Sequence, residues 1–212
     1  MPKAAAPKTE SLYGVHPSVV MVQKWLAELK GKTGRSLEEW IALVKKEGPK
    51  GETARRAWLK TRHKMGMNSA WWIAERAEGK GADEDSPEEY LKAAVRYVEE
   101  QYGGPKEKLR PIYDVLLAKG RALGPDVKAC PCRTIVPLYR QHVFAQIKPT
   151  TNSRVDLGFA LKDYKGKLPK RLVDTGGLAK KDRITHRIEI TSLADIDADV
   201  DKWLTIAYDL DA

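Results

Sequence analysis

The sequence lacks long apolar runs and a secretory leader. No window approaches the roughly 18 to 20 unbroken apolar residues that a membrane helix needs. The opening segment, MPKAAAPKTESLYG, has no apolar core of the kind found in signal peptides. We therefore expect a cytoplasmic protein that contacts no membrane, with residues 1–16 as a flexible tail.

Cysteine is scarce. Cys130 and Cys132 are the only two among 212 residues, and they form the triplet Cys-Pro-Cys. A disulfide between residues two apart would close a small, strained ring, which disfavours one. Common zinc sites need four ligands, usually with wider Cys spacing. We expect two reduced, partly buried thiols, and a metal or redox role for the pair is the alternative.

Catalytic signatures are missing as well. The sequence contains no glycine-rich phosphate loop, no HExxH, no GxSxG and no tight group of Asp, Glu and His with metal-ligand spacing. This disfavours nucleotide hydrolysis and zinc proteolysis. No nucleophile and base are paired by spacing. The prediction is a protein that is not an enzyme, with no catalytic residue and no cofactor.

What the sequence does have is positive charge, unevenly distributed. The formal net charge is +9. Counting Lys and Arg against Asp and Glu, residues 1–82 carry +8 and residues 101–170 carry +9, whereas 83–100 carry −5 and 171–212 carry −3. Two basic regions favour an anionic partner, either nucleic acid or an acidic protein. A merely solvated basic surface is the alternative.

The first half has the pattern of four short helices. Apolar residues recur at spacings of three and four from Val19 to Lys30, and Ser36 to Glu39 reads as a capping box that starts a second helix. A third helix is predicted around Glu52 to His63, and a fourth with Asn68 as its N-cap. Together they predict a helical module over residues 17–79.

An acidic linker is predicted over residues 80–86, followed by a second domain over 87–212. Ser86 and Pro87 start a helix, a second one ends near Leu123, and Ser192 caps the last. Between them the apolar period changes from 3.6 to 2, which is typical of strands. The strands are predicted at Thr134–Tyr139, His142–Lys148, Arg154–Leu161 and Arg183–Ile190, with a short edge strand at Asp126–Cys130.

These elements predict an α+β fold. A four-helix N-terminal module is followed by a domain of two helices, an antiparallel β-meander and a C-terminal helix. No strands alternate with helices as a parallel sheet would require.

Basic side chains on the third helix form the first candidate site. The pair of helices over residues 53–78 has helix-turn-helix spacing, and its first helix carries Arg55, Arg56, Lys60 and Arg62. A DNA reader needs polar residues at the start of its second helix. Here the apolar residues Ala70 to Ile73 follow almost at once. This favours a packed helical hairpin, with insertion into a DNA groove as the alternative.

A second candidate site lies on the predicted sheet. Alternation turns Val155, Leu157, Phe159 and Leu161 toward the core, and it turns Arg154, Asp156 and Gly158 the other way. Neighbouring strands contribute Lys148 and Tyr139 to this polar face. His186 alternates with Ile184, Ile188 and Ile190, so it is either a satisfied core residue or part of a pocket. The candidates for anion or ligand binding are therefore Arg154, Lys148, Tyr139 and His186, together with the basic residues of the third helix.

Both halves resemble families of unknown function. The segments KTGRSLEEW, AWLK and AWWIAE resemble the helical domain-of-unknown-function family 4287. The segments GPKEKLRPIYDVLLAKGRALGPDV, HVFAQIKPTTNSRVDLGFAL and THRIEITS resemble the domain-of-unknown-function family 5655. The resemblance implies a bacterial cytoplasmic protein with an α+β C-terminal domain. It transfers no catalytic residue.

Two functional hypotheses follow. The preferred one is a non-enzymatic binding protein of two modules, whose basic surfaces engage nucleic acid or an acidic protein. The other is a domain that binds a small molecule or a metal in a pocket on the C-terminal sheet, near Arg154, Lys148, Tyr139 and His186, with Cys130 and Cys132 as possible metal ligands.

Overall fold

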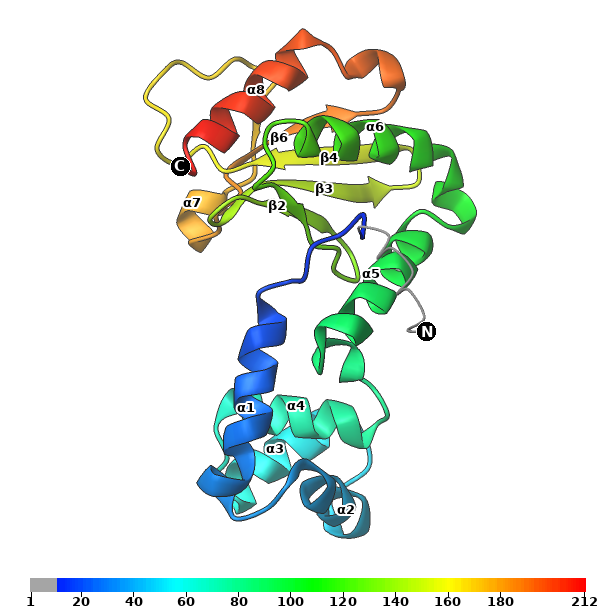
Figure 1. The fold of residues 1–212 in the computed structure, drawn as a ribbon, viewed down its shortest axis with the longest axis vertical. Helices are drawn as coiled ribbons and strands as arrows, with labels where there is room; N and C mark the ends of the chain where they lie inside the picture. Colours follow the sequence, from blue (N-terminus) through cyan, green and yellow to red (C-terminus); the bar gives the residue numbers. More distant parts are fainter. Residues whose placement is uncertain (1–10) are drawn as a thin grey trace, which may run out of the picture. The chain divides into compact units, whose positions relative to one another are not determined.

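The computed structural model describes residues 11–212, and the chain forms two compact units (Figure 1). One unit comprises Val15–Ala93. The other comprises Ala94–Ala212 together with the described residues before Val15. The helices are α1 (Ser18–Thr33), α2 (Leu37–Glu47), α3 (Glu52–Arg62), α4 (Met67–Ala77), α5 (Pro87–Gln101), α6 (Arg110–Arg121), α7 (Gly177–Lys180) and α8 (Ala198–Asp209), with 3-10 turns η1 (Ala82–Glu84), η2 (Gly104–Leu109) and η3 (Leu193–Asp195).

The first unit is built around one apolar cluster contributed by α1 to α4. Its fully buried members include Val44, Leu59 and Ile73, and Trp40 and Leu29 pack with them. Trp25 and Trp58 cover the cluster from its edge. The predicted four-helix module is thus confirmed, because each helix has one apolar stripe and the stripes bury one another.

Capping residues in the sequence predicted the start of α2 correctly and the start of α4 wrongly. Ser36 accepts a hydrogen bond from the Glu39 amide at 3.3 Å, and the Glu39 carboxylate accepts one from the Ser36 amide at 2.6 Å. The predicted capping box is therefore present. The predicted N-cap at Asn68 is wrong: α4 already begins at Met67, with Gly66 in extended backbone before it. The Gly66 carbonyl accepts from the Ala70 amide and closes the first turn, so the side chain of Asn68 has no capping task.

Replacing Ser36 by alanine is expected to lower the free energy of unfolding by about 1 kcal/mol, because two amides at the start of α2 lose their reciprocal bonds. Urea unfolding followed by circular dichroism measures this. An unchanged midpoint would show that water replaces the cap without cost.

The boundary between the units differs from the predicted one. The division falls within α5, between Ala93 and Ala94, and not at residues 80–86. In that segment Asp85 forms an ion pair with the buried guanidinium of Arg76, which ties the predicted linker to α4. Ser86 and Pro87 do start α5 as predicted, and the Ser86 hydroxyl accepts from the Glu89 amide. A helix start is a local signal, but it does not show where tertiary contacts change.

The predicted tail is also folded in part. Residues 1–10 of it lie outside the described residues. Tyr13 is buried, and its hydroxyl lies 3.0 Å from that of Tyr113 on α6. The Gly14 amide donates to the carbonyl of Ala129 at 2.9 Å. Residues 11–14 therefore pack against the second unit. The tail prediction missed this because a single tyrosine carries no periodic signal.

The second unit contains a six-stranded antiparallel sheet in the order β1-β2-β3-β4-β6-β5. Its strands are β1 (Lys128–Ala129), β2 (Val136–Tyr139), β3 (Val143–Thr151), β4 (Arg154–Phe159), β5 (Val173–Asp174) and β6 (His186–Ile190). The predicted meander and edge strand are present. Neither β5 nor α7 was predicted, because two strand residues and one helical turn are too short to show a period.

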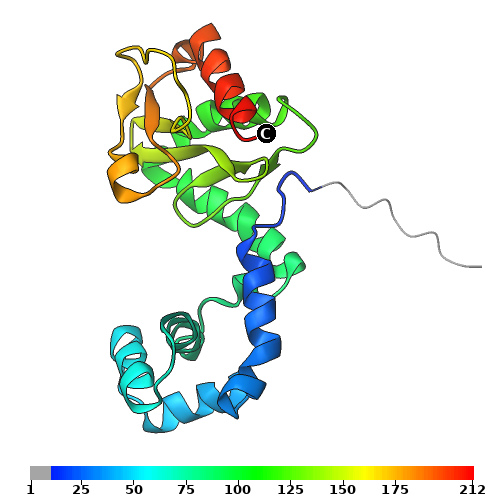
Figure 2. The same cartoon turned by 90° about the vertical axis from the view of Figure 1, so that its left-hand side faces the viewer.

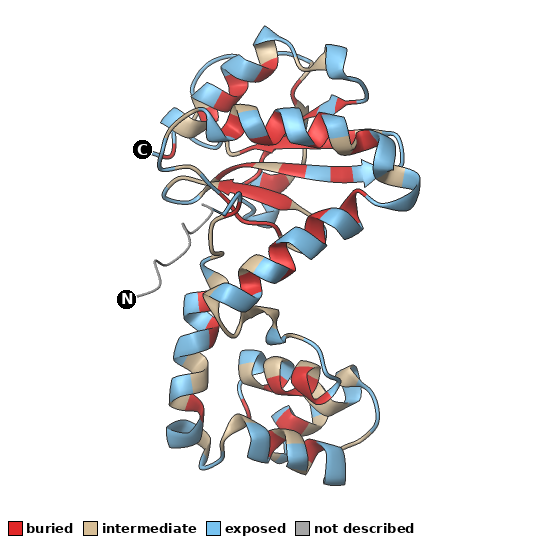
Figure 3. Cartoon of the chain, turned by 45° about the vertical axis from the view of Figure 1, so that its right-hand side comes forward, coloured by how far each residue is buried: buried red, intermediate tan, exposed pale blue. Residues whose placement is uncertain are grey.

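Helices α6 and α8 lie side by side against one face of the sheet (Figures 1 and 2). An ion pair of 2.6 Å between Lys119 and Asp201 joins them. The residues Val155, Leu157 and Phe159 of β4 are completely buried, as the alternation predicts. Buried residues follow the strands and the inner sides of these helices in Figure 3. The predicted α+β architecture is confirmed, and the opposite face of the sheet carries the polar residues.

Candidate functional site

Asp156 is the centre of the polar face of the sheet. This carboxylate is almost fully buried, and Arg154 Nε lies 2.8 Å from its Oδ1. Thr150 Oγ1 donates to Oδ2 at 2.7 Å, and Arg187 Nε lies 3.5 Å from the same atom. Neither Nε is aligned well enough to donate a hydrogen bond, so both arginines act here as ion-pair partners. One buried carboxylate is thereby balanced by two guanidinium groups.

A second carboxylate completes this network. Glu189 Oε1 lies 3.2 Å from Arg154 Nη1 and 2.9 Å from Arg187 Nη2. Two arginines and two carboxylates therefore neutralise one another on adjacent strands, because Asp156 and Glu189 are register partners. The predicted ligand residue Arg154 is thus already occupied by protein carboxylates.

Gly158, the smallest residue on the polar face of β4, is covered by two side chains. A Cβ placed on Gly158 would lie 2.6 Å from Ile184 Cγ2 and 3.0 Å from Gln146 Cγ, so these two side chains fill the space above the glycine. Ile184 therefore lies over Gly158, on the polar face, and its predicted place beside Ile188 is wrong. The reason is that β6 begins only at His186, so strand alternation does not extend back to Ile184. A hollow of about 180 Å³ remains here.

The other sheet candidates are spread along the strands. Lys148 is exposed, and it pairs in register with Asp156. Tyr139 and His186 lie at the other end of the sheet from Lys148. Tyr139 pairs with Val143 at the start of β3, and His186 pairs with Phe159 at the end of β4. Burial raises the pKa of Tyr139 to about 12, and His186 Nδ1 lies 3.0 Å from the Thr185 hydroxyl. The structure therefore brings Lys148 close to Arg154 but does not join Tyr139 and His186 to them.

The basic residues of α3 have separate environments. Arg55 is held by the Pro49 carbonyl at 3.0 Å and by Glu78 at 2.5 Å, so it joins segments within the first unit. Arg56 stacks over Trp71, with its guanidinium carbon 5.6 Å from the ring centroid. Lys60 and Arg62 are exposed.

The start of α4 is packed rather than open. Ala70 and Ile73 are completely buried in the cluster of the first unit. Of the adjacent tryptophans, Trp71 is 42% exposed and Trp72 is half-buried, as expected for one outward-facing ring. A recognition helix would present its N-terminal residues to a DNA groove. The geometry therefore favours the packed hairpin over groove insertion.

Neither cysteine of the Cys-Pro-Cys triplet forms a disulfide. Cys130 is buried, and this burial raises the pKa of its thiol to about 12. The thiol is therefore protonated at neutral pH, whereas a metal binds the thiolate. The backbone here is tied down, since the Cys132 amide donates to the Ile135 carbonyl at 2.8 Å. Within residues 11–212, no group of three or more His, Cys, Asp or Glu side chains has a metal-binding arrangement.

A basic groove lies at the corner between β3 and β4, beside the end of α5 and η2. We call it the corner groove. It encloses about 550 Å³. Its lining residues are Glu100, Gln101, Gly103, Pro105, Lys106, Arg133, Thr134, Lys148, Pro149, Thr150 and Asn152. Lys106 and Arg133 were missed, because they come from segments distant in sequence from Lys148.

Polar contacts shape the corner groove. Lys106 Nζ donates to the Pro149 carbonyl at 2.5 Å, which holds η2 against β3. Gln101 Nε2 donates to the Cys132 carbonyl at 2.8 Å, and this bond fixes the orientation of the amide. The Oε1 atom of Gln101 is buried and accepts no hydrogen bond from the described residues. The groove thus offers three cations against the single carboxylate of Glu100.

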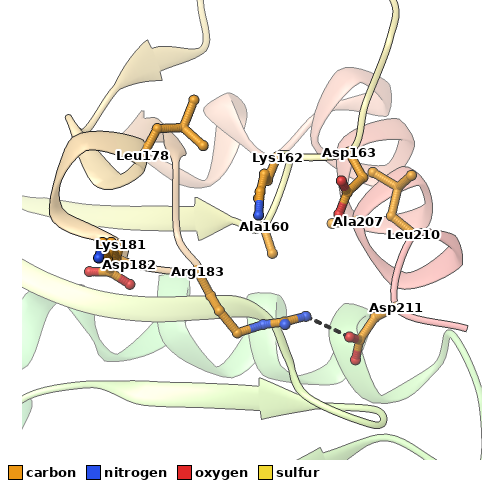
Figure 4. A pocket seen from close by; sticks show the side chains of 10 residues that line it. All are labelled: Ala160, Lys162, Asp163, Leu178, Lys181, Asp182, Arg183, Ala207, Leu210 and Asp211. Carbon is orange, nitrogen blue, oxygen red and sulfur yellow. Dashed lines mark hydrogen bonds and ion pairs between the residues drawn. The ribbon is translucent and has the colours of Figure 1, made fainter.

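A second pocket of about 450 Å³ lies between α7, the end of β4 and the end of α8 (Figure 4). We call it the charged pocket. Its lining residues are Ala160, Lys162, Asp163, Leu178, Lys181, Asp182, Arg183, Ala207, Leu210 and Asp211. Four of its ten lining residues come from α7 and the loop after it, so the pattern of strands and helices in the sequence did not reveal it.

Comparison with known proteins gives two matches, both to domain models. Residues 21–79 match the Domain of unknown function (DUF4287), and residues 98–211 match the Domain of unknown function (DUF5655). No curated protein and no solved structure matches the chain. No helix within residues 11–212 is long and apolar enough to cross a membrane. Since the second model spans more than half of the sequence and coincides with the sheet-containing unit, the chain belongs to the DUF5655 family.

Proposed function

We propose that this protein is a non-enzymatic binding protein that holds the phosphate backbone of a nucleic acid in the corner groove. The observation that carries the proposal is the convergence of Lys106, Arg133 and Lys148 around one groove with a single carboxylate. Lysine and arginine are the side chains that most often contact phosphate oxygens. Arg154, by contrast, is neutralised by its carboxylate partners and contributes little.

The lining favours nucleic acid over an acidic protein. Protein interfaces are anchored by buried aromatic, methionine or other large apolar side chains. The corner groove has none of these, and Pro105 and Pro149 are its only apolar residues apart from Gly103. It also has no aromatic ring on which a base could stack. Binding should therefore depend on backbone charge and have little sequence preference.

Hydroxyl groups add to the cations of the corner groove. The hydroxyls of Thr134 and Thr150, which also line the groove, can donate to phosphate oxygens.

Fluorescence anisotropy with labelled 20-nucleotide single strands tests the proposal. Three phosphate contacts on a single strand give a slope of about −2 in log K against log salt, so affinity should fall by more than tenfold between about 50 and 200 mM salt. Absence of binding to both an RNA strand and a DNA strand at about 50 mM salt would overturn the proposal. If poly-glutamate at equal charge concentration displaces RNA, the partner is an acidic protein and not a nucleic acid.

Replacing Lys148 by glutamine is expected to weaken RNA binding by about five- to tenfold and to reduce the salt slope by about 0.7, because one phosphate contact is lost. The Lys165→Gln variant is the matched control. Lys165 is exposed and lies outside the corner groove, so the same loss of charge there should change the affinity less than twofold. Equal losses in both variants would mean that net charge, and not the groove, binds the strand.

A further inference from the structure

The charged pocket has the size and setting of a small-molecule site. Its volume of about 450 Å³ lies within the usual range for ligand pockets. It is separate from the corner groove, with which it shares no lining residue. In Figure 4 the side chains of Lys162 and Arg183 reach toward its centre from different segments.

One side of the pocket is held in place by an ion pair between Arg183 and the buried carboxylate of Asp211. Arg183 Nη2 lies 2.7 Å from Asp211 Oδ1, and Arg183 Nε donates to the Val143 carbonyl at 3.1 Å. Asp211 is only 5% exposed, and it also accepts from the backbone amide of His142 at 2.7 Å. The position of the Arg183 guanidinium is thus set by the protein before any ligand arrives.

Two large apolar side chains form facing walls. Leu178 on α7 is 56% exposed and Leu210 at the end of α8 is 38% exposed, and they stand on opposite sides of the hollow in Figure 4. Ala160 and Ala207 lie between them. Exposed leucines that face each other across a pocket with small residues between them leave room for an apolar group.

The charges that line the pocket are balanced. Three cations, Lys162, Lys181 and Arg183, face three carboxylates, Asp163, Asp182 and Asp211. Arg183 and Asp211 already neutralise each other. In the described part of the chain, Lys162 and Asp163 form no ion pair. A simple anion or cation would meet both signs of charge, whereas a zwitterion can pair with both.

The wall formed by α7 is rigid. Lys181 ends this helix with φ of 57°, a left-handed conformation that is uncommon for a residue other than glycine. The next residue is tied down at both ends, since the Asp182 amide donates to the Gly177 carbonyl at 2.9 Å and its carboxylate accepts from the Ile184 amide at 3.1 Å. Backbone held in this way at a pocket rim is a common feature of ligand sites.

We propose that the charged pocket binds a small zwitterion with an apolar side group, such as leucine or methionine. The carboxylate meets Lys162, beside the Arg183–Asp211 pair, and the ammonium group meets Asp163. The side group lies between Leu178 and Leu210. The proposal is independent of nucleic-acid binding in the corner groove.

Isothermal titration calorimetry on the full chain tests this with leucine and three analogues. Isocaproate lacks the ammonium group, 3-methylbutylamine lacks the carboxylate, and glycine lacks the side group. Leucine should give saturable binding, and each analogue should bind at least tenfold more weakly. The proposal is overturned if isocaproate or the amine binds as tightly as leucine, or if no apolar amino acid binds.

Two exposed leucines provide matched variants. Leu178→Gln should weaken leucine binding at least tenfold, because it replaces one apolar wall. Leu193→Gln should leave it unchanged, since Leu193 is 52% exposed and lies outside the pocket. Equal effects of the two would contradict the proposed wall. Lys148→Gln should not alter leucine binding, so failure here and failure of the nucleic-acid proposal are distinguishable.

Discussion

Replacing Trp203 by alanine is expected to lower the free energy of unfolding by about 3–5 kcal/mol, the largest stability effect predicted for this protein. Trp203 is the largest side chain among the nearly fully buried residues of the chain as described, and it anchors α8 to the sheet-containing unit. Its ring also packs edge-on against Tyr164, with centroids 5.3 Å apart. Removing it leaves a large cavity. Urea unfolding followed by circular dichroism at 222 nm measures the loss.

The Trp203→Phe variant is the informative control. Trp203 Nε1 is buried and has no hydrogen-bond partner among the described residues, so the native indole carries an unsatisfied donor. Phenylalanine keeps most of the apolar volume and removes that donor, which offsets part of the packing loss. We expect a cost of less than about 1.5 kcal/mol. If phenylalanine costs as much as alanine, the shape of the indole ring outweighs its polar atom.

Replacing Gly177 by alanine is expected to cost about 3 kcal/mol. A Cβ at this position would lie 2.2 Å from the Ile184 carbonyl oxygen and 3.0 Å from the Thr175 hydroxyl oxygen. The nearest obstacle is backbone, so no side-chain rotation relieves the clash and α7 must move. Because α7 carries Leu178, the same substitution should also weaken binding in the charged pocket. Thermal unfolding and leucine titration of the variant report these two effects separately.

Gly31→Ala is the matched control for this substitution. Gly31 lies in α1, and nothing lies within 4 Å of a Cβ added there. Alanine favours a helix interior over glycine by about 1 kcal/mol, so this variant should be more stable than the wild type. Destabilisation by both substitutions would show that the crowding at Gly177 is not the cause.

The helices and most strands were predictable because their signals are local. Ser36 and Glu39 are three residues apart, and the strand from Val155 to Phe159 alternates over its whole length. From such patterns alone, one can predict which atoms form hydrogen bonds and which side chains share a face, because both depend only on residues close in sequence. Prediction failed where the local pattern was short or ambiguous. Asn68 is a good capping residue two positions after the actual N-cap, Gly66, and β5 has two residues.

The candidate sites were predicted less well than the fold. Arg154 is on the predicted face, yet Asp156 and Glu189 occupy it. Gly158 is small, yet Ile184 fills the space above it. In both positions the residue type was read correctly. Asp156 lies on the same strand as Arg154, but the places of Glu189 and Ile184 depend on β6, whose exact start was not visible in the sequence.

The sequence by itself determined the two-part organisation, the confirmed helix caps, the antiparallel meander and the basic character of the region from residue 101 to 170. Only the tertiary structure decided which charges converge and which cancel. Lys106, Arg133 and Lys148 meet because η2, the segment before β2 and the second half of β3 come together at one corner. Charge along a chain is a sum over residues, whereas a binding site depends on distances between residues far apart in sequence, and those distances are set by the packing of the core.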